Sequence, residues 1–176
     1  MQIKASCSYS QDAVRAFVLS NAFGKRDPKK QFYGFMIGLA ALLAVCLFEI
    51  MVFGWEFFSL LLLVCILLIS LLYSYIYFLL PVVQFRAMGK LQNTRNTYLF
   101  SDESIAVSSE NPELTGASEI RYTLIAKTVE TSRYFFLYQN RRQAFLVDKA
   151  TIEGGTAEQI REKMISAGGK YRLCRY

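Results

Sequence analysis

The sequence predicts a membrane α-helical hairpin joined to an α+β cytosolic domain. Two long apolar runs, residues 32–53 and 57–83, are separated by only a short turn. No lysine or arginine occurs between Lys30 and Arg86. After Arg95 the pattern changes to short segments rich in β-branched and aromatic residues, which is typical of strands. The chain therefore divides into three parts, at residues 1–30, 31–85 and 97–176.

The first part predicts a strand followed by a short helix. Apolar and polar residues alternate over residues 2–9, and a period of two indicates a half-buried strand. A strand needs a pairing partner, so we expect it to join the C-terminal sheet, with a disordered terminus as the alternative. Ser10 is the expected N-cap of a helix over residues 11–23. That helix either packs on the domain or lies in the membrane interface.

The two apolar runs are each long enough to cross a bilayer. At about 1.5 Å per residue they measure roughly 33 and 40 Å, against a hydrocarbon core of about 30 Å. Neither run carries the polar stripe of a helix on a soluble protein. The first run is too long for the apolar part of a signal peptide and lacks a small-residue cleavage site. Both runs are therefore predicted to span the membrane.

Charge at the ends of the hairpin predicts its orientation. The net charge is +6, and the excess cations lie beside the apolar runs, whereas the turn between the runs has none. By the positive-inside rule both termini face the cytoplasm. The near-neutral C-terminal part lacks the basic surface of a nucleic-acid binder. The candidate contacts to lipid headgroups are Lys25, Arg26, Lys29, Lys30, Arg86 and Lys90.

The C-terminal part predicts a meander of about six strands closed by one helix. The expected strands are 97–100, 104–108, 118–122, 125–130, 134–139 and 143–147. Residues 110–116 contain an Asn-Pro pair and are expected to form a loop. Thr156 is the expected N-cap of a helix ending near Gly168. Residues 170–176 interleave cations with aromatics, so we expect them either to dip into the membrane interface or to fray.

One stretch, residues 120–150, carries a recognisable family pattern. The pattern residues are Ile120, Tyr122, Ile125, Lys127, Val129, Glu130, Thr131, Phe136, Leu137, Tyr138, Ala144, Phe145 and Lys149. In these the chain resembles the YcxB-like family of bacterial membrane proteins, and the likeness extends over nearly the whole chain. It departs at Tyr122, where the family commonly has Trp, and at Asp148, where Pro is usual. The resemblance implies a small pleckstrin-homology-like partial barrel, a bacterial cytoplasmic membrane and no known activity.

The sequence offers no catalytic or metal-binding pattern. It contains no histidine, the commonest general base and metal ligand. Its cysteines, Cys7, Cys46, Cys65 and Cys174, have no metal-ligand spacing. A cytosolic location disfavours disulfides. We therefore expect neither an enzyme nor a cofactor.

A few charged and aromatic residues are candidates for binding. Glu49 is the only charge inside the first run, and it either makes an intramembrane polar contact or reaches the nearby interface. Trp55, in the turn, is a candidate interface anchor. A cationic rim for an anionic lipid or an acidic partner is predicted at Arg133, Arg141, Arg142 and Lys149, with a solvated turn as the alternative.

Together these features favour a membrane-anchored interaction module that binds a protein or an anionic lipid at the inner leaflet. The alternative is an integral-membrane regulator or immunity-type protein whose hairpin recognises a partner in the bilayer. The expected partners are membrane lipids and a protein of unknown identity. A homo-oligomer remains open, and nucleic acid is not expected.

Overall fold

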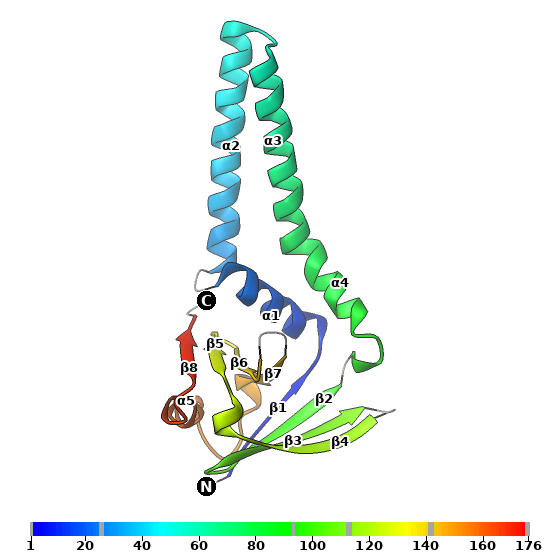
Figure 1. Ribbon diagram of the computed structural model, residues 1–176, viewed down its shortest axis with the longest axis vertical. Coiled ribbons are helices and arrows are strands. Elements are labelled where there is room, and N and C mark those ends of the chain that lie inside the picture. Colours follow the sequence, from blue (N-terminus) through cyan, green and yellow to red (C-terminus); the bar gives the residue numbers. More distant parts are fainter. Residues whose placement is uncertain (1, 25–26, 93, 112–113, 141–142, 175–176) are drawn as a thin grey trace.

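The computed structural model describes residues 2–24, 27–92, 94–111, 114–140 and 143–174. A helical hairpin rises from a β-rich domain that contains both ends of the chain (Figure 1). The helices are α1 (Gln11–Phe23), α2 (Pro28–Phe53), α3 (Phe57–Ser74), η1 (Tyr75–Leu79), α4 (Leu80–Ala87), η2 (Gly89–Leu91), η3 (Tyr122–Leu124), η4 (Lys149–Thr151) and α5 (Ala157–Ser166). The strands are β1 (Ile3–Ser8), β2 (Arg95–Phe100), β3 (Ser104–Asn111), β4 (Leu114–Arg121), β5 (Lys127–Glu130), β6 (Tyr134–Tyr138), β7 (Ala144–Asp148) and β8 (Lys170–Leu173).

The N-terminal strand belongs to the C-terminal domain, as its alternating pattern predicted. β1 pairs antiparallel with β2, with Ile3 opposite Phe100 and Cys7 opposite Asn96, in a sheet of order β1-β2-β3-β4. Ile3, at 1% exposed, is part of the hydrophobic core. In the sequence, the whole hairpin is therefore inserted between two strands that are neighbours in one sheet.

The predicted loop over residues 110–116 is wrong at residues 110–111 and 114–116, and residues 112 and 113 lie outside the described part of the chain. β3 continues to Asn111 and β4 starts at Leu114, and the ladder pairs Glu110 with Thr115 and Ser109 with Gly116. Most of the described residues at this end of the β3–β4 pair are exposed. A sheet face that remains in solvent needs no apolar residues, so strand residues here are as polar as those of a loop.

The second sheet has the order β7-β6-β5-β8, and its β5–β8 pair is parallel. The sequence did not predict β8, because residues 170–173 were assigned to a tail at the membrane interface or to a frayed end. Instead they add a strand beside β5, and the Cys174 N–H continues the pairing with the Glu130 carbonyl at 2.6 Å. Lys170-Tyr171-Arg172-Leu173 alternates with period two, but four residues are too few to identify a strand by pattern alone.

The hydrophobic core lies between the two sheets and α5. It contains fully buried aromatic residues from both sheets, including Tyr98, Phe100, Phe135 and Phe136, and Ile160 from α5. Thr156 caps α5 as predicted, accepting from the Gln159 N–H at 3.3 Å. The two sheets remain separate, so the domain is not a closed barrel.

The two arms of the hairpin differ in shape. α2 is continuous from Pro28 to Phe53 and ends at Gly54, whose φ of 81° favours glycine. The second arm contains the π-helical turn η1 just before Pro81. Because Pro81 has no N–H to continue the regular bonding pattern, the chain changes helical type there. α4 then packs against α1 rather than against α2.

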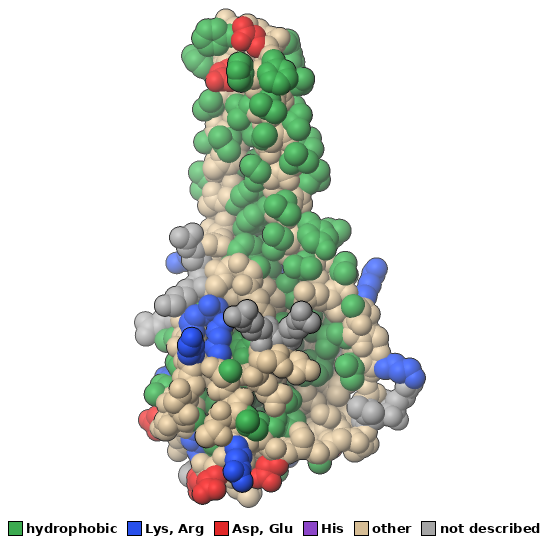
Figure 2. Space-filling view, viewed as in Figure 1, with side chains coloured by type: hydrophobic (Ala, Val, Ile, Leu, Met, Phe, Trp, Pro, Cys, Tyr) green, Lys and Arg blue, Asp and Glu red, His purple; other side chains and the backbone are tan. Residues whose placement is uncertain are grey.

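The hairpin surface is apolar and exposed. Met51 is 85% exposed and Phe58 is 74% exposed, and Figure 2 shows hydrophobic side chains along this part of the molecule. The helices Pro28–Phe53 and Phe57–Ala87 are long and apolar enough to cross a membrane. A core helix of a soluble protein would have most of this surface buried.

Candidate functional site

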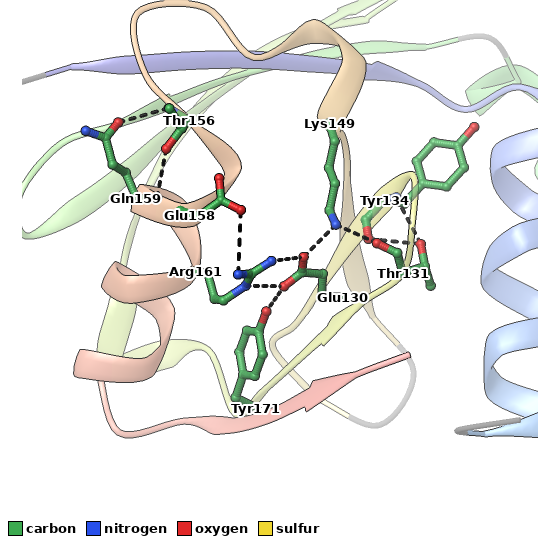
Figure 3. Close-up of polar contacts among 9 residues, drawn as sticks. All are labelled: Glu130, Thr131, Tyr134, Lys149, Thr156, Glu158, Gln159, Arg161 and Tyr171. Carbon is green, nitrogen blue, oxygen red and sulfur yellow. Dashed lines mark hydrogen bonds and ion pairs between the residues drawn. The ribbon is translucent and has the colours of Figure 1, made fainter. Parts of the chain in front are cut away.

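Of the sequence candidates that the structure describes, Lys149 lies in a polar network inside the domain and Arg133 on an exposed turn, and the others lie at the base or the tip of the hairpin. The network centres on Glu130, whose side chain is 1% exposed. Lys149 donates to Glu130 Oε1 at 2.6 Å, and Arg161 donates to both carboxylate oxygens at 2.6 and 2.8 Å. The Tyr171 hydroxyl donates to Oε2 (Figure 3). One carboxylate thus ties β5 to η4, α5 and β8.

The network determines the charge state of Glu130. Burial alone raises the pKa of this carboxyl, but hydrogen bonds from Arg161 and Lys149 outweigh burial, so the pKa lies below its ordinary value. Lys149 also donates to the Thr131 carbonyl at 2.6 Å, and its side chain is 16% exposed. Glu130 and Lys149 therefore form an ion pair inside the domain in this structure.

Residues 100–164 match the model of the family described as YcxB-like protein. The chain carries a YcxB-like domain. No curated protein and no solved structure matches the sequence.

The matched segment of the YcxB-like domain is smaller than the folded unit. It begins at the last residue of β2 and ends within α5. It therefore omits β1 at one edge of the first sheet and β8 at one edge of the second. It includes Glu130, Lys149 and Arg161 but not Tyr171, so the fourth group of the network comes from outside the match.

The predicted cationic rim of the YcxB-like domain is only partly placed. Arg133 is on the turn after β5, with a side chain 60% exposed and paired with Asp148 at 3.2 Å. Its guanidinium lies 5.0 Å from the centre of the Tyr134 ring. The Lys149 N–H donates to the Arg133 carbonyl at 2.9 Å, but the Lys149 side chain pairs with Glu130. Arg141 and Arg142 are outside the described residues, so the rim stays a prediction.

The juxtamembrane cations follow the predicted pattern at the base of the hairpin. Lys29 and Lys30 are exposed in the first turn of α2, Arg86 is exposed in α4, and Lys90 is exposed in η2. Figure 2 shows Lys and Arg side chains near this base and none on the hairpin above it. Lys25 and Arg26 lie outside the described residues. Contacts of these cations with lipid remain predictions.

The tip of the hairpin contains the two remaining candidates. Trp55 is 75% exposed in the turn. Glu49 is half-buried near the end of α2, one turn before that helix ends. Ser59 stabilises the start of α3, because its Oγ accepts from the Glu56 N–H at 3.1 Å. The acidic groups are therefore at the end of the hairpin opposite the cations.

Aromatic side chains fix the base of the hairpin to the domain. The Phe35 and Tyr73 rings stack with centroids 3.9 Å apart, and the Phe32 and Tyr77 centroids are 4.9 Å apart. Phe23 of α1 lies 5.7 Å from Tyr73. Such ring pairs contribute about 0.5–1.5 kcal/mol beyond their burial. The hairpin is thus joined to α1 by packing as well as by the chain.

Sequence reasoning missed the cavities beside this base. An apolar cavity of about 520 Å³ lies between α1, α4 and β7, with Val14, Phe17, Met88, Leu91 and Phe145 in its lining. A second, charged cavity of about 410 Å³ lies between α1, the start of α2, η1 and the β5–β6 turn. Each brings together residues from three or more distant segments, so no spacing in the sequence could reveal it.

The buried thiol of Cys7 is not a reactive site. Burial, and then the nearby charge of Asp148, raises its pKa to about 12. It therefore stays protonated at neutral pH, where only the thiolate is a good nucleophile or metal ligand. Among the described residues no group of three or more His, Cys, Asp or Glu side chains could hold a metal ion.

Proposed function

We propose that this chain is a membrane-anchored interaction module, in which the hairpin spans the bilayer and holds the YcxB-like domain at the inner leaflet. The domain then binds a protein partner or an anionic lipid. Binding, rather than catalysis, is proposed because the sequence has no histidine and no recognisable catalytic constellation.

The observation that carries the proposal is that an exposed apolar hairpin emerges from within the folded domain. β1 and α1 precede the hairpin, β2 follows it, and β1 pairs with β2. A hairpin at a chain end could trail from a flexible linker, but this one is fixed at both ends. The domain is therefore held close to the bilayer in a limited range of orientations.

Charge supports a cytoplasmic location for both termini. Lys29, Lys30 and Arg86 lie at the base of the hairpin, whereas the tip has Glu56 and no cation. Cationic ends are retained on the cytoplasmic side during insertion. We place the protein in a bacterial cytoplasmic membrane because the chain resembles the YcxB-like family of bacterial membrane proteins. We also propose that the two-sheet domain is related to pleckstrin-homology-like folds, as the family resemblance implies.

A second candidate function is recognition of a partner within the bilayer by the hairpin, and one observation favours it. Gly34 and Gly38 are four residues apart on α2, and a Cβ built at either position meets nothing within 4 Å. Small residues with this spacing allow close approach of a second transmembrane helix. This face could serve a regulator, an immunity-type protein or a homo-oligomer.

Crosslinking of the full-length protein in its native membrane distinguishes the two functions. A photoreactive amino acid is placed at Ser108 on the domain surface or at Gly38 on the hairpin, and the products are purified in mild detergent. The interaction module predicts a discrete heterologous product from position 108. A product only from position 38 would favour recognition in the bilayer. Extraction of the protein by alkaline carbonate would contradict both.

A further inference from the structure

A charged cavity at the base of the hairpin is not explained by the proposed function alone. It has a volume of about 410 Å³, within the range of small-ligand sites. Its lining joins α1 to the first turn of α2, to η1 and to the turn between β5 and β6. These elements are fixed relative to one another by the β1–β2 pairing and by the aromatic contacts at the base of the hairpin.

The cavity contains opposite charges that do not neutralise one another. Asp12 and Arg15 come from α1, and Asp27 and Lys29 come from the start of α2. In the described part of the chain, none of these four makes an ion pair. The third cation, Arg133, is already paired with Asp148. Two cations and two carboxylates thus remain without an ion-pair partner around one space, and of these Asp27 also accepts the Lys29 N–H at 2.9 Å through Oδ1.

Part of the cavity lining is apolar and aromatic. Leu19, Pro28 and Tyr134 are buried in its lining, and Tyr77 is half-buried. The Arg15 guanidinium lies 5.4 Å from the centre of the Tyr77 ring, a cation–π contact between two residues of the lining. Aromatic faces of this kind also attract an ammonium group of a ligand.

We propose that this cavity binds the phosphoethanolamine headgroup of a zwitterionic phospholipid. Arg15 and Lys29 bind the phosphate, and Asp12 and Asp27 accept hydrogen bonds from the ammonium. A headgroup with a negative charge alone would leave both carboxylates without a partner, which disfavours it. A trimethylammonium group has no N–H to donate to a carboxylate, so a choline headgroup satisfies the site less well.

The inference rests on the proposed insertion of the hairpin into a bilayer. Lys29 precedes the apolar run by three residues, roughly 5 Å along the helix axis. If the apolar run fills the hydrocarbon core, the cavity lies at the depth of the lipid headgroups. A headgroup can then enter it without its acyl chains leaving the bilayer.

The test uses the full-length protein in nanodiscs of phosphatidylcholine, phosphatidylglycerol and phosphatidylethanolamine. Lipids that remain bound after mild detergent extraction are measured by mass spectrometry. We expect enrichment of phosphatidylethanolamine over its bulk fraction. Arg15→Gln and Asp12→Asn should each reduce this enrichment about tenfold, the effect of one charge-assisted hydrogen bond. Arg15→Lys should retain part of it, because the charge remains.

The matched control is Arg121→Gln, which removes an exposed cation at the end of β4 that is neither in the cavity lining nor among the candidate headgroup contacts. It should leave the enrichment unchanged. Enrichment of phosphatidylglycerol, equal retention of all three lipids, or an Arg15→Gln variant as selective as wild type would each overturn the inference. Carbonate resistance of each variant is measured in parallel. An inserted protein without selectivity refutes the inference alone, whereas a protein that never inserts refutes the proposed function as well.

Discussion

The hairpin exposes its apolar side chains, whereas the YcxB-like domain buries them. In the hairpin Met51 and Phe58 are 85% and 74% exposed, whereas Phe135 and Phe136 of the domain are 0% exposed. The two regions also differ in charge. The domain buries the carboxylate of Glu130 among cations, whereas residues 31–85 carry only two acids, Glu49 and Glu56, and no lysine or arginine. The same hydrophobic effect explains both arrangements if the hairpin has lipid as its solvent.

The two regions meet at α1, which belongs structurally to both. Phe17 packs on Phe136 of the second sheet with centroids 5.6 Å apart, and Phe23 packs on Tyr73 of the hairpin. Residues 11–23 thus pack on the domain, which was one of the two sequence alternatives, and their position in the membrane interface stays a prediction. The hairpin is consequently an insertion in a discontinuous domain rather than an anchor appended to it.

The largest effect should come from deletion of residues 2–9. This removes β1 and its buried Ile3, Ala5 and Cys7. Truncating one buried isoleucine to alanine already costs about 2–5 kcal/mol, and β2 would also lose its pairing partner. We expect loss of cooperative thermal unfolding of the domain, followed by circular dichroism in detergent. Replacing Trp55 at the tip by Ala is the control, and a deletion variant that melts like wild type would refute the discontinuous domain.

Glu130→Gln should be the next largest change. It leaves the Lys149 and Arg161 cations without the buried carboxylate that they share. Removing one partner of a buried ion pair costs about 3–5 kcal/mol. Glu49→Gln is the matched change in the hairpin, where no described residue pairs with the carboxylate, and it should change the free energy of unfolding by under about 0.5 kcal/mol. Chemical denaturation of the two variants measures the difference, and equal effects would contradict the structural role of Glu130.

Acid should destabilise the domain through the same residue. Because the pKa of Glu130 is lowered in the folded state from its ordinary 4.5, its stabilisation is complete above that value. It is lost as the pH falls below 4.5 and through the folded-state pKa. Denaturation midpoints measured between neutral and acidic pH should show this loss in wild type. The Glu130→Gln variant should show a smaller loss, and an identical pH profile would argue against it.

The smallest effect should come from helix capping. The Ser10 side chain accepts from the Ala13 N–H at 3.3 Å at the start of α1, and Asp27 accepts from the Lys29 N–H at 2.9 Å at the start of α2. Ser10→Ala should lower the free energy of unfolding of the domain by about 1 kcal/mol. Asp27→Ala should affect it less, since a long apolar helix in a bilayer is held by its surroundings. Denaturation curves in which Asp27→Ala destabilises the protein more than Ser10→Ala would contradict this difference between the two regions.

The sequence predicted the elements whose signal is local or repeated. The apolar runs, the Ser10 and Thr156 caps and the alternation in residues 2–9 each depend on neighbouring side chains. β8 and the strand residues 110–111 and 114–116 were missed because their stability comes from pairing with distant backbone. The π-helical turn before Pro81 was missed because a proline signals an interruption but not its form.

The candidate sites were harder to predict than the fold. Lys149 was taken for a surface cation, although its family-pattern neighbour Glu130 is the residue it binds. Two charges of opposite sign in the stretch that carries the family pattern gave no indication that they pair with each other inside the domain. Arg15 and Asp12 were not singled out, because their relation to Lys29 depends on how α1 meets the hairpin. Such sites are made by the tertiary fold, and spacing along the chain does not encode them.

Sidedness of the hairpin tip relative to the domain tests the central claim most directly. Cys174 is fully buried, so the native thiol is a poor probe of its compartment. Single cysteines at Trp55 in the tip and Glu103 on the domain surface, each in place of the native residue, avoid this problem. In intact cells an impermeant thiol reagent should label position 55, and it should label position 103 only after the membrane is opened. Labelling of both positions from outside, or of neither until lysis, would contradict a spanning hairpin that holds the domain in the cytoplasm.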